Sequence, residues 1–164
     1  WALSHLGYNA LLQNKFDQAA AFYKESGVIF ESVGPHKSGM AWAYFGLGET
    51  ALAQKESTLA VEDIKNAAKF FWGYKNRWGI VWCIETLACI MSLKNDHELA
   101  AKLWGAADSL REAKGVREAP ILRDLHEDLK TKSQKKLGET KFKSLWNENQ
   151  YITLEQAVKD LIAL

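Results

Sequence analysis

The sequence predicts an all-α fold in which antiparallel helical hairpins stack side by side. Apolar residues recur with helical spacing along the whole chain, and alternating, strand-like runs are missing. Glycines and helix-capping residues divide the chain at short intervals. One seven-residue pattern, Trp-x4-Leu-small, begins at Trp1, Trp42 and Trp82, so its copies lie 41 and 40 residues apart. A hairpin cannot bury its own apolar face, and repeats of this length therefore predict stacking.

Capping residues place the helix starts in the first two thirds of the chain. Asn14 with Asp17, Ser57, and Asn95 with Glu98 stand where helices are expected to begin. Glycines mark where helices are expected to end: Gly34 before Pro35, Gly73 and Gly115. The six helices predicted from these signals cover residues 1–13, 16–32, 37–54, 57–72, 77–93 and 96–114.

The last third of the chain has a different rhythm and predicts three further helices. Pro120 can begin a helix that runs to about Leu137, because its missing N–H has no partner in a first turn anyway. Gly138 ends that helix, and a short helix is expected over 139–148. Thr153-Leu-Glu-Gln156 has the form of a capping box and opens the last helix, which runs to residue 164. About nine helices are predicted in all.

The three copies share a pattern of small and large residues on both helices of each hairpin. In the second helix an Ala is followed by a large residue four positions on and by a small residue three positions after that. The large residue is aromatic in the first and third copies and aliphatic in the second. These triplets are Ala19-Tyr23-Ser26, Ala60-Ile64-Ala67 and Ala100-Trp104-Ala107. The pattern predicts one domain, 1–164, made of repeats 1–34, 35–74 and 75–115 and of capping helices 116–164.

The repeats resemble the tetratricopeptide repeat. Leu6-Gly7 and Leu47-Gly48 keep the Leu-Gly pair of its W-x2-L-G-x2-Y…A-x3-F pattern, and Phe16-Asp-Gln-Ala19 resembles its turn into the second helix. The period of 40–41 is longer than the 34 residues of that family, and the terminal Pro is absent. The resemblance covers residues 1–115 and implies a right-handed superhelix that binds a partner on its concave face.

A second resemblance covers residues 99–164. Ala100 to Gly115 (AAKLWGAADSLREAKG), Leu137 to Glu148 and Thr153 to Val158 follow one another as they do at the C-terminal end of large bacterial regulators. These are LuxR-type or adenylate-cyclase-linked proteins and signal-transduction ATPases, in which helical repeats follow a nucleotide-binding domain. The resemblance implies a sensor or interaction module of a cytoplasmic transcription regulator, which would pass its signal to upstream domains of the same chain.

The repeated tryptophans and their neighbours one and two turns on are the candidate binding residues. In stacked repeats of this kind the first helices line the concave face, which would bring these side chains into one groove that binds a protein, a peptide or a small effector. The alternative is that long helices make a thick core and the Trp side chains fill it, as Trp usually does. The candidate residues are Trp1, Ser4, Tyr8, Trp42, Phe45, Glu49, Trp82, Glu85 and Cys89.

Residues for chemistry are sparse, and no catalytic, cofactor-binding or metal-binding residue is predicted. The histidines are scattered as His5, His36, His97 and His126, without the spacing of metal ligands, and are expected to be surface or capping residues. No strained nucleophile turn of the Gly-x-Ser-x-Gly type appears. Cys83 and Cys89 are six residues apart among apolar neighbours, which favours buried thiols over a disulfide. The sequence therefore favours a non-catalytic protein.

The charge balance gives little attraction to nucleic acid or to a membrane. Lys and Arg number 21 against 20 Asp and Glu, for a net charge of +1. The basic run 130–136, with Lys141 and Lys143, fits a solvated helix face better than a nucleic-acid contact, because no aromatic residues interleave with it. The chain starts in mid-pattern, so a preceding repeat is expected, and an isolated fragment could dimerise through that end. A purely structural, self-associating scaffold remains the alternative function.

Overall fold

The computed structural model describes residues 1–34, 37–115, 122–149 and 152–163, and within these ranges the chain forms nine α-helices and no strand. The all-α prediction, with its stacked antiparallel hairpins and its number of helices, is confirmed for these residues. The helices are α1 (Ala2–Leu12), α2 (Phe16–Ser32), α3 (Lys37–Ala53), α4 (Ser57–Gly73), α5 (Arg77–Leu93), α6 (His97–Lys114), α7 (Arg123–Leu137), α8 (Glu139–Glu148) and α9 (Leu154–Ala163).

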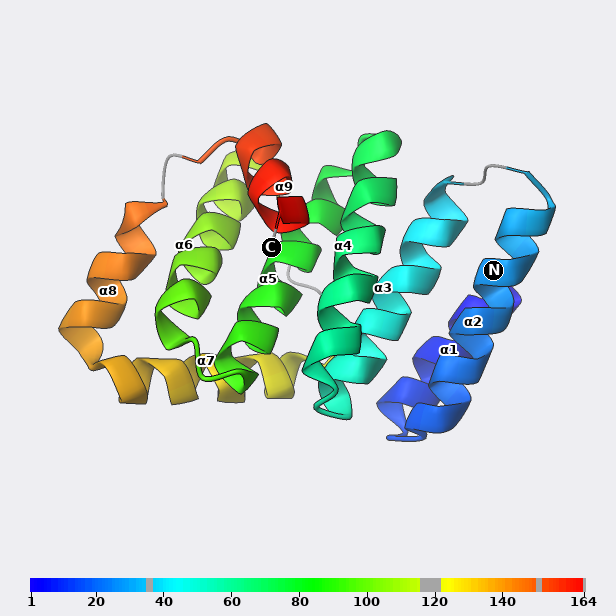
Figure 1. Ribbon diagram of the computed structural model, residues 1–164, viewed down its shortest axis with the longest axis horizontal. Helices are drawn as coiled ribbons and strands as arrows, with labels where there is room; N and C mark the ends of the chain where they lie inside the picture. Colours follow the sequence, from blue (N-terminus) through cyan, green and yellow to red (C-terminus); the bar gives the residue numbers. More distant parts are fainter. Residues whose placement is uncertain (35–36, 116–121, 150–151, 164) are drawn as a thin grey trace.

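The first six helices form three antiparallel hairpins in a row, α1–α2, α3–α4 and α5–α6 (Figure 1). Each helix packs against the one before and the one after it in the chain. The first helices of the hairpins also contact one another, α1 with α3 and α3 with α5. We call the surface that these three helices form the first-helix face. Equivalent positions of successive repeats therefore lie side by side on this face.

The same backbone turn follows four of the helices, α1, α3, α4 and α5. One residue in each turn takes the left-handed conformation, and the N–H of the next residue bonds to a carbonyl five residues back, which is the Schellman arrangement. Asn14 and Asn95, predicted near helix starts, take this left-handed position instead. For α6 the capping residue is Asp96, whose carboxylate accepts a bond from the N–H of Leu99. The left-handed residues are Asn14, Lys55, Lys75 and Asn95.

Close contacts between helices also repeat from one hairpin to the next. The ring of Phe30, near the end of α2, covers Gly39 in the first turn of α3, and Phe71 covers Gly79 of α5 in the same way. A Cβ atom built on either glycine would lie 2.3 Å from the ring. Only a residue without a side chain lets the next hairpin approach this closely, so these glycines set the spacing of the array.

The three tail helices cover different parts of the third hairpin and reach beyond it. Helix α7 crosses the array along its lower edge in Figure 1 and packs on α5 and α6, while α8 packs on α6 and α7. Helix α9 returns to the middle of the molecule and packs on α4 and α5. The predicted cap at Thr153 is present, because its hydroxyl accepts a bond from the N–H of Gln156 at 3.1 Å. Helix α7 begins at Arg123, and the predicted start at Pro120 lies outside the described residues.

No helix in the described part of the chain is both long and apolar enough to cross a membrane.

Candidate functional site

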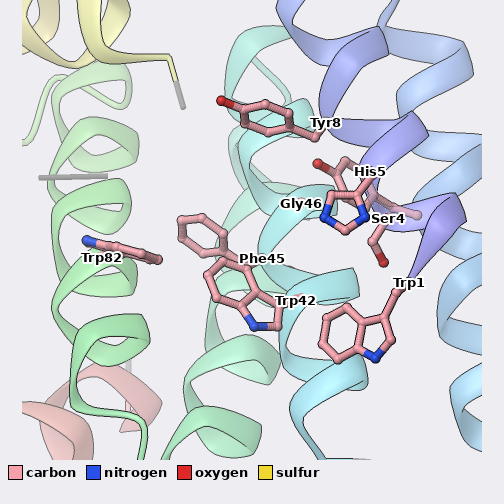
Figure 2. A pocket seen from close by; sticks show the side chains of 9 residues that line it. Trp1, Ser4, His5, Tyr8, Trp42, Phe45, Gly46 and Trp82 are labelled. Atoms are coloured by element: carbon pink, nitrogen blue, oxygen red, sulfur yellow. The ribbon is translucent and has the colours of Figure 1, made fainter. Parts of the chain in front are cut away.

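A cavity of about 290 Å³ opens on the first-helix face between α1, α3 and α5. Figure 2 shows the rings of Trp42 and Phe45 between Trp1 on one side and Trp82 on the other. Six of the nine residues around the cavity are aromatic, so its wall is mainly apolar. We call it the aromatic pocket. Its lining residues are Trp1, Ser4, His5, Tyr8, Tyr23, Trp42, Phe45, Gly46 and Trp82.

The tryptophans enter this pocket because the repeat brings equivalent positions together. Trp1 meets the ring of Phe30 edge-on with centroids 5.1 Å apart, and Trp42 meets Phe71 in the same geometry at 5.3 Å. Phe30 and Phe71 are 41 residues apart, as Trp1 and Trp42 are, so each pair occupies one place in its own hairpin. The ring of Trp82 lies 5.6 Å from that of Trp42. The three tryptophans thus form a row across the face.

The exposure of these tryptophans lies between the two alternatives that the sequence left open. Trp1 is 54% exposed, whereas Trp42 and Trp82 are half-buried. Trp42 has one part of its ring in the core, against Phe71, while the residue still lines the cavity. Each of the two rings therefore contributes both to the packing of the array and to the wall of the pocket.

The base of the pocket is formed by a hydrogen-bonded pair of serines and by a buried tyrosine. The hydroxyls of Ser4 and Ser26 lie 2.7 Å apart and join α1 to α2 inside the protein. Tyr23 is buried between two first helices, with its ring against Gly7 of α1 and Gly46 of α3. Burial, with the nearby carboxylate of Glu49, raises the pKa of Tyr23 well above its usual value, so its hydroxyl stays protonated.

Glu49 does not line the pocket, although it was predicted there. Its side chain is fully buried one turn beyond Phe45, where it accepts a hydrogen bond from the hydroxyl of Thr86. His126 of α7 places Nε2 3.4 Å from Oε1 of Glu49. Burial alone would lower the pKa of His126, but the charge of Glu49 and contacts with Cys89 outweigh it and raise that pKa well above its usual value. Glu49 and His126 therefore form a buried ion pair that ties α7 to α3.

Cys89 and Glu85 also lie outside the pocket. Cys89 is fully buried near His126, and burial raises the pKa of its thiol, which leaves it protonated and unreactive at neutral pH. Glu85 pairs with Arg111 of α6 and faces α7 rather than Glu49. Six of the nine predicted residues thus line the pocket: Trp1, Ser4, Tyr8, Trp42, Phe45 and Trp82.

Three lining residues and the ion-pair histidine were not predicted. Tyr23 belongs to a second helix, and it reaches the first-helix face only because Gly7 and Gly46 leave room for its ring. Gly7 was noted only as part of the Leu-Gly pair of the repeat, and no role was predicted for Gly46. His5 was expected at the surface and is indeed exposed, at the rim of the pocket. The expectation that His126 is an ordinary surface or capping residue is wrong, because Glu49 and Cys89 hold it inside.

The two cysteines are buried, and three lysines of the basic region have partners within the protein. Cys83 and Cys89 are free, buried thiols, as expected. The described residues contain no group of three or more His, Cys, Asp or Glu placed to hold a metal ion. Within the basic region, Lys130 lies over the ring of Trp146 at 4.6 Å, and Lys141 and Lys143 pair with Glu98 and Glu139.

None of the family models, curated proteins and solved structures with which the chain was compared matches it.

Proposed function

We propose that this protein is a non-catalytic binding module whose first-helix face, the concave face of a tetratricopeptide-type array, holds a protein, a peptide or a small effector. One observation carries the proposal: three repeat-equivalent tryptophans converge on an open aromatic pocket. A solvent-accessible cluster of large aromatic side chains is costly to leave uncovered, and such clusters commonly mark binding sites.

The setting of this module follows from the resemblance of residues 99–164 to the ends of bacterial regulators. We place it in a cytoplasmic transcription regulator of the LuxR or signal-transduction-ATPase type. There the array would sense a ligand and pass the signal to upstream domains of the same chain. This setting rests on the spacing of three tail segments, from Ala100 to Gly115, from Leu137 to Glu148 and from Thr153 to Val158.

A selection with a displayed peptide library and with a set of small metabolites tests the proposal. Binders are selected on the intact chain and then measured on two tryptophan variants. We expect Trp42→Ala to abolish binding and Trp78→Ala to leave it unchanged, because Trp78 is exposed and lies outside the pocket. Circular dichroism would check that both variants remain folded. Binders that retain their affinity for folded Trp42→Ala would contradict the proposed site.

A self-associating scaffold is the second candidate, and the first hairpin favours it. Leu6 of α1 and Val28, Ile29 and Val33 of α2 are each at least 45% exposed. The positions equivalent to Leu6 and Ile29 in the third hairpin are Leu87 and Leu110, which are buried. Sedimentation equilibrium separates the two functions. A dimer that dissociates in the double variant Leu6→Ser, Ile29→Ser but not in Trp42→Ala would support the scaffold.

A further inference from the structure

We infer that the natural occupant of the aromatic pocket is a small, uncharged aromatic compound. The inference rests on the proposed function, since it names the ligand class of the same site. It is drawn from the charge, the hydrogen-bonding groups and the size of the pocket.

The first step concerns charge at the wall. None of the described residues that line the pocket is Asp, Glu, Lys or Arg. An ion that leaves water for such a site loses hydration worth several kcal/mol and gains no charged partner in return. Apolar surface, in contrast, is stabilised by about 25 cal/mol for each Å² removed from water. The wall therefore favours an uncharged ligand.

The second step concerns the charge nearest to the pocket. Aromatic faces attract cations, and the buried carboxylate of Glu49 lies one turn beyond Phe45. Its charge is already matched by His126, whose Nε2 lies 3.4 Å from the carboxylate oxygen. Glu49 is thus committed to holding α7, so a cation in the pocket would meet aromatic faces but no carboxylate. An anion would find no Lys or Arg among the described lining residues, and the polar groups nearest to it would be His5 and the first turn of α1 at the rim.

The third step concerns hydrogen bonds. Ser4 is occupied by Ser26, and Tyr23 is buried behind Gly46. Apart from the indole N–H groups of the tryptophans, which can only donate, the described lining residues leave Tyr8 and His5 to orient a polar atom of the ligand. A sugar or another molecule with many hydroxyls would leave most of them unpaired, at a cost of about 1–3 kcal/mol each. A flat ring with one or two polar atoms fits this distribution.

The fourth step concerns size. A volume of about 290 Å³ lies at the lower limit of small-molecule sites, and nine residues are far fewer than the 20–30 that a standard protein interface uses on each side. Rings that pack at centroid distances of 5.6–6.2 Å already surround the cavity. A further ring between Trp1 and Trp42 would extend this packing and gain the additional stabilisation of aromatic pairs.

Fluorine NMR with three matched aromatic probes tests the ligand class. The probes are 5-fluoroindole, which is uncharged, 4-fluorobenzoate, an anion, and 4-fluorophenyltrimethylammonium, a cation. We expect the signal of 5-fluoroindole to broaden and shift on addition of the protein, with an affinity at least about tenfold above that of either charged probe. Equal binding of the three probes, or tighter binding of a charged one, would overturn the inference.

Variants then place the bound probe. Trp1→Ala is the safer test, because that ring is more than half exposed and its loss should leave the fold intact, and Trp42→Ala is the stronger one. We expect both to weaken binding of 5-fluoroindole and Trp78→Ala to leave it unchanged. Undiminished binding by both pocket variants would overturn the inference. If 5-fluoroindole fails to bind while selected peptides still depend on Trp42, the ligand class is wrong and the proposed function stands.

Discussion

The first-helix face has two regions that occupy equivalent places in the repeat but differ in what covers them. Around α1 and α3 it carries Trp42 packed on Phe71, with Phe45 one turn on, and it is open. On α5 and α6 the places of Phe71 and Phe45 are taken by Arg111 and Glu85, which pair with each other beside α7. The aromatic region is thus open to a ligand. The charged region is not, because Glu85 and Arg111 lie against charged and polar residues of α7.

The comparison shows that the backbone repeat and the function of its surface are separable. The turns and the helix spacing recur along the array, whereas the face changes from aromatic to charged within one repeat. Glu49 lies one turn beyond Phe45, and Thr86 lies one turn beyond Trp82. The hydroxyl of Thr86 donates a hydrogen bond to Glu49 and so connects the two regions. His126 adds α7 to the same cluster.

The largest effect is expected from breaking this connection. His126→Ala leaves the carboxylate of Glu49 buried without its cationic partner, which we expect to lower the free energy of unfolding by about 3–5 kcal/mol. The double variant Glu49→Gln, His126→Gln should recover much of that loss, because neither charge remains. Urea unfolding followed by circular dichroism measures all three proteins. A loss below about 1 kcal/mol in His126→Ala would show that the pair does not hold α7.

The same pair predicts a pH dependence. The pKa of His126 is raised in the folded protein, so its contribution to stability is complete below its unfolded pKa of about 6.5 and is lost as the pH rises through the folded pKa. The wild type should therefore lose stability above pH 6.5. The slope should be shallower in the variant without both charges.

A smaller effect is expected from the contact that builds the floor of the open region. A Cβ atom at Gly46 would lie 2.2 Å from the ring of Tyr23, so Gly46→Ala should cost about 1–3 kcal/mol through overpacking. Gly27→Ala is the matched control, because its Cβ would make an ordinary contact of 3.6 Å with Ala43. There the change should be neutral or stabilising, since Ala favours a helix. Thermal unfolding compares the two, and an equal response would mean that Tyr23 can move away from Gly46.

The sequence was sufficient to predict the array, because its information is local and repeated. Helical spacing, capping residues and the three Trp-x4-Leu-small segments gave nine helices, and the observed bounds differ by a few residues at most where they are described. The face of the first helices followed from the same register, and it brought Trp1, Trp42 and Trp82 together.

The parts that the sequence could not predict depend on the tail. Glu49 and Cys89 fall on the first-helix face by register, yet they are buried because α7 crosses back over that part of the array. The partner of Glu49 is 77 positions along the chain, at His126, and helical periodicity contains no information about contacts at that separation. Tyr23 was missed for a related reason, since its access to the pocket depends on two glycines in different helices.

The smallest effect on stability is expected at Asp63 of α4, which lies away from both regions. This residue serves as a reference for charge effects that do not involve the first-helix face. Burial, opposed in part by Lys24, raises the pKa of Asp63 to about 6 from 3.8. A carboxyl whose pKa is raised in the folded state binds its proton more tightly there than in the unfolded chain. The contribution of Asp63 to the free energy of unfolding is therefore most favourable below pH 3.8 and is lost as the pH rises through about 6. Asp63→Asn should therefore stabilise the protein at pH 7, by less than about 1 kcal/mol because the site is partly solvated, and should have no effect near pH 3.5.

Because Asp63 does not contact α7, this variant should leave the alkaline loss of stability assigned to His126 unchanged. A shift in that alkaline slope would show that charges on the second helices contribute to it, and the slope could then no longer be assigned to the Glu49–His126 pair alone.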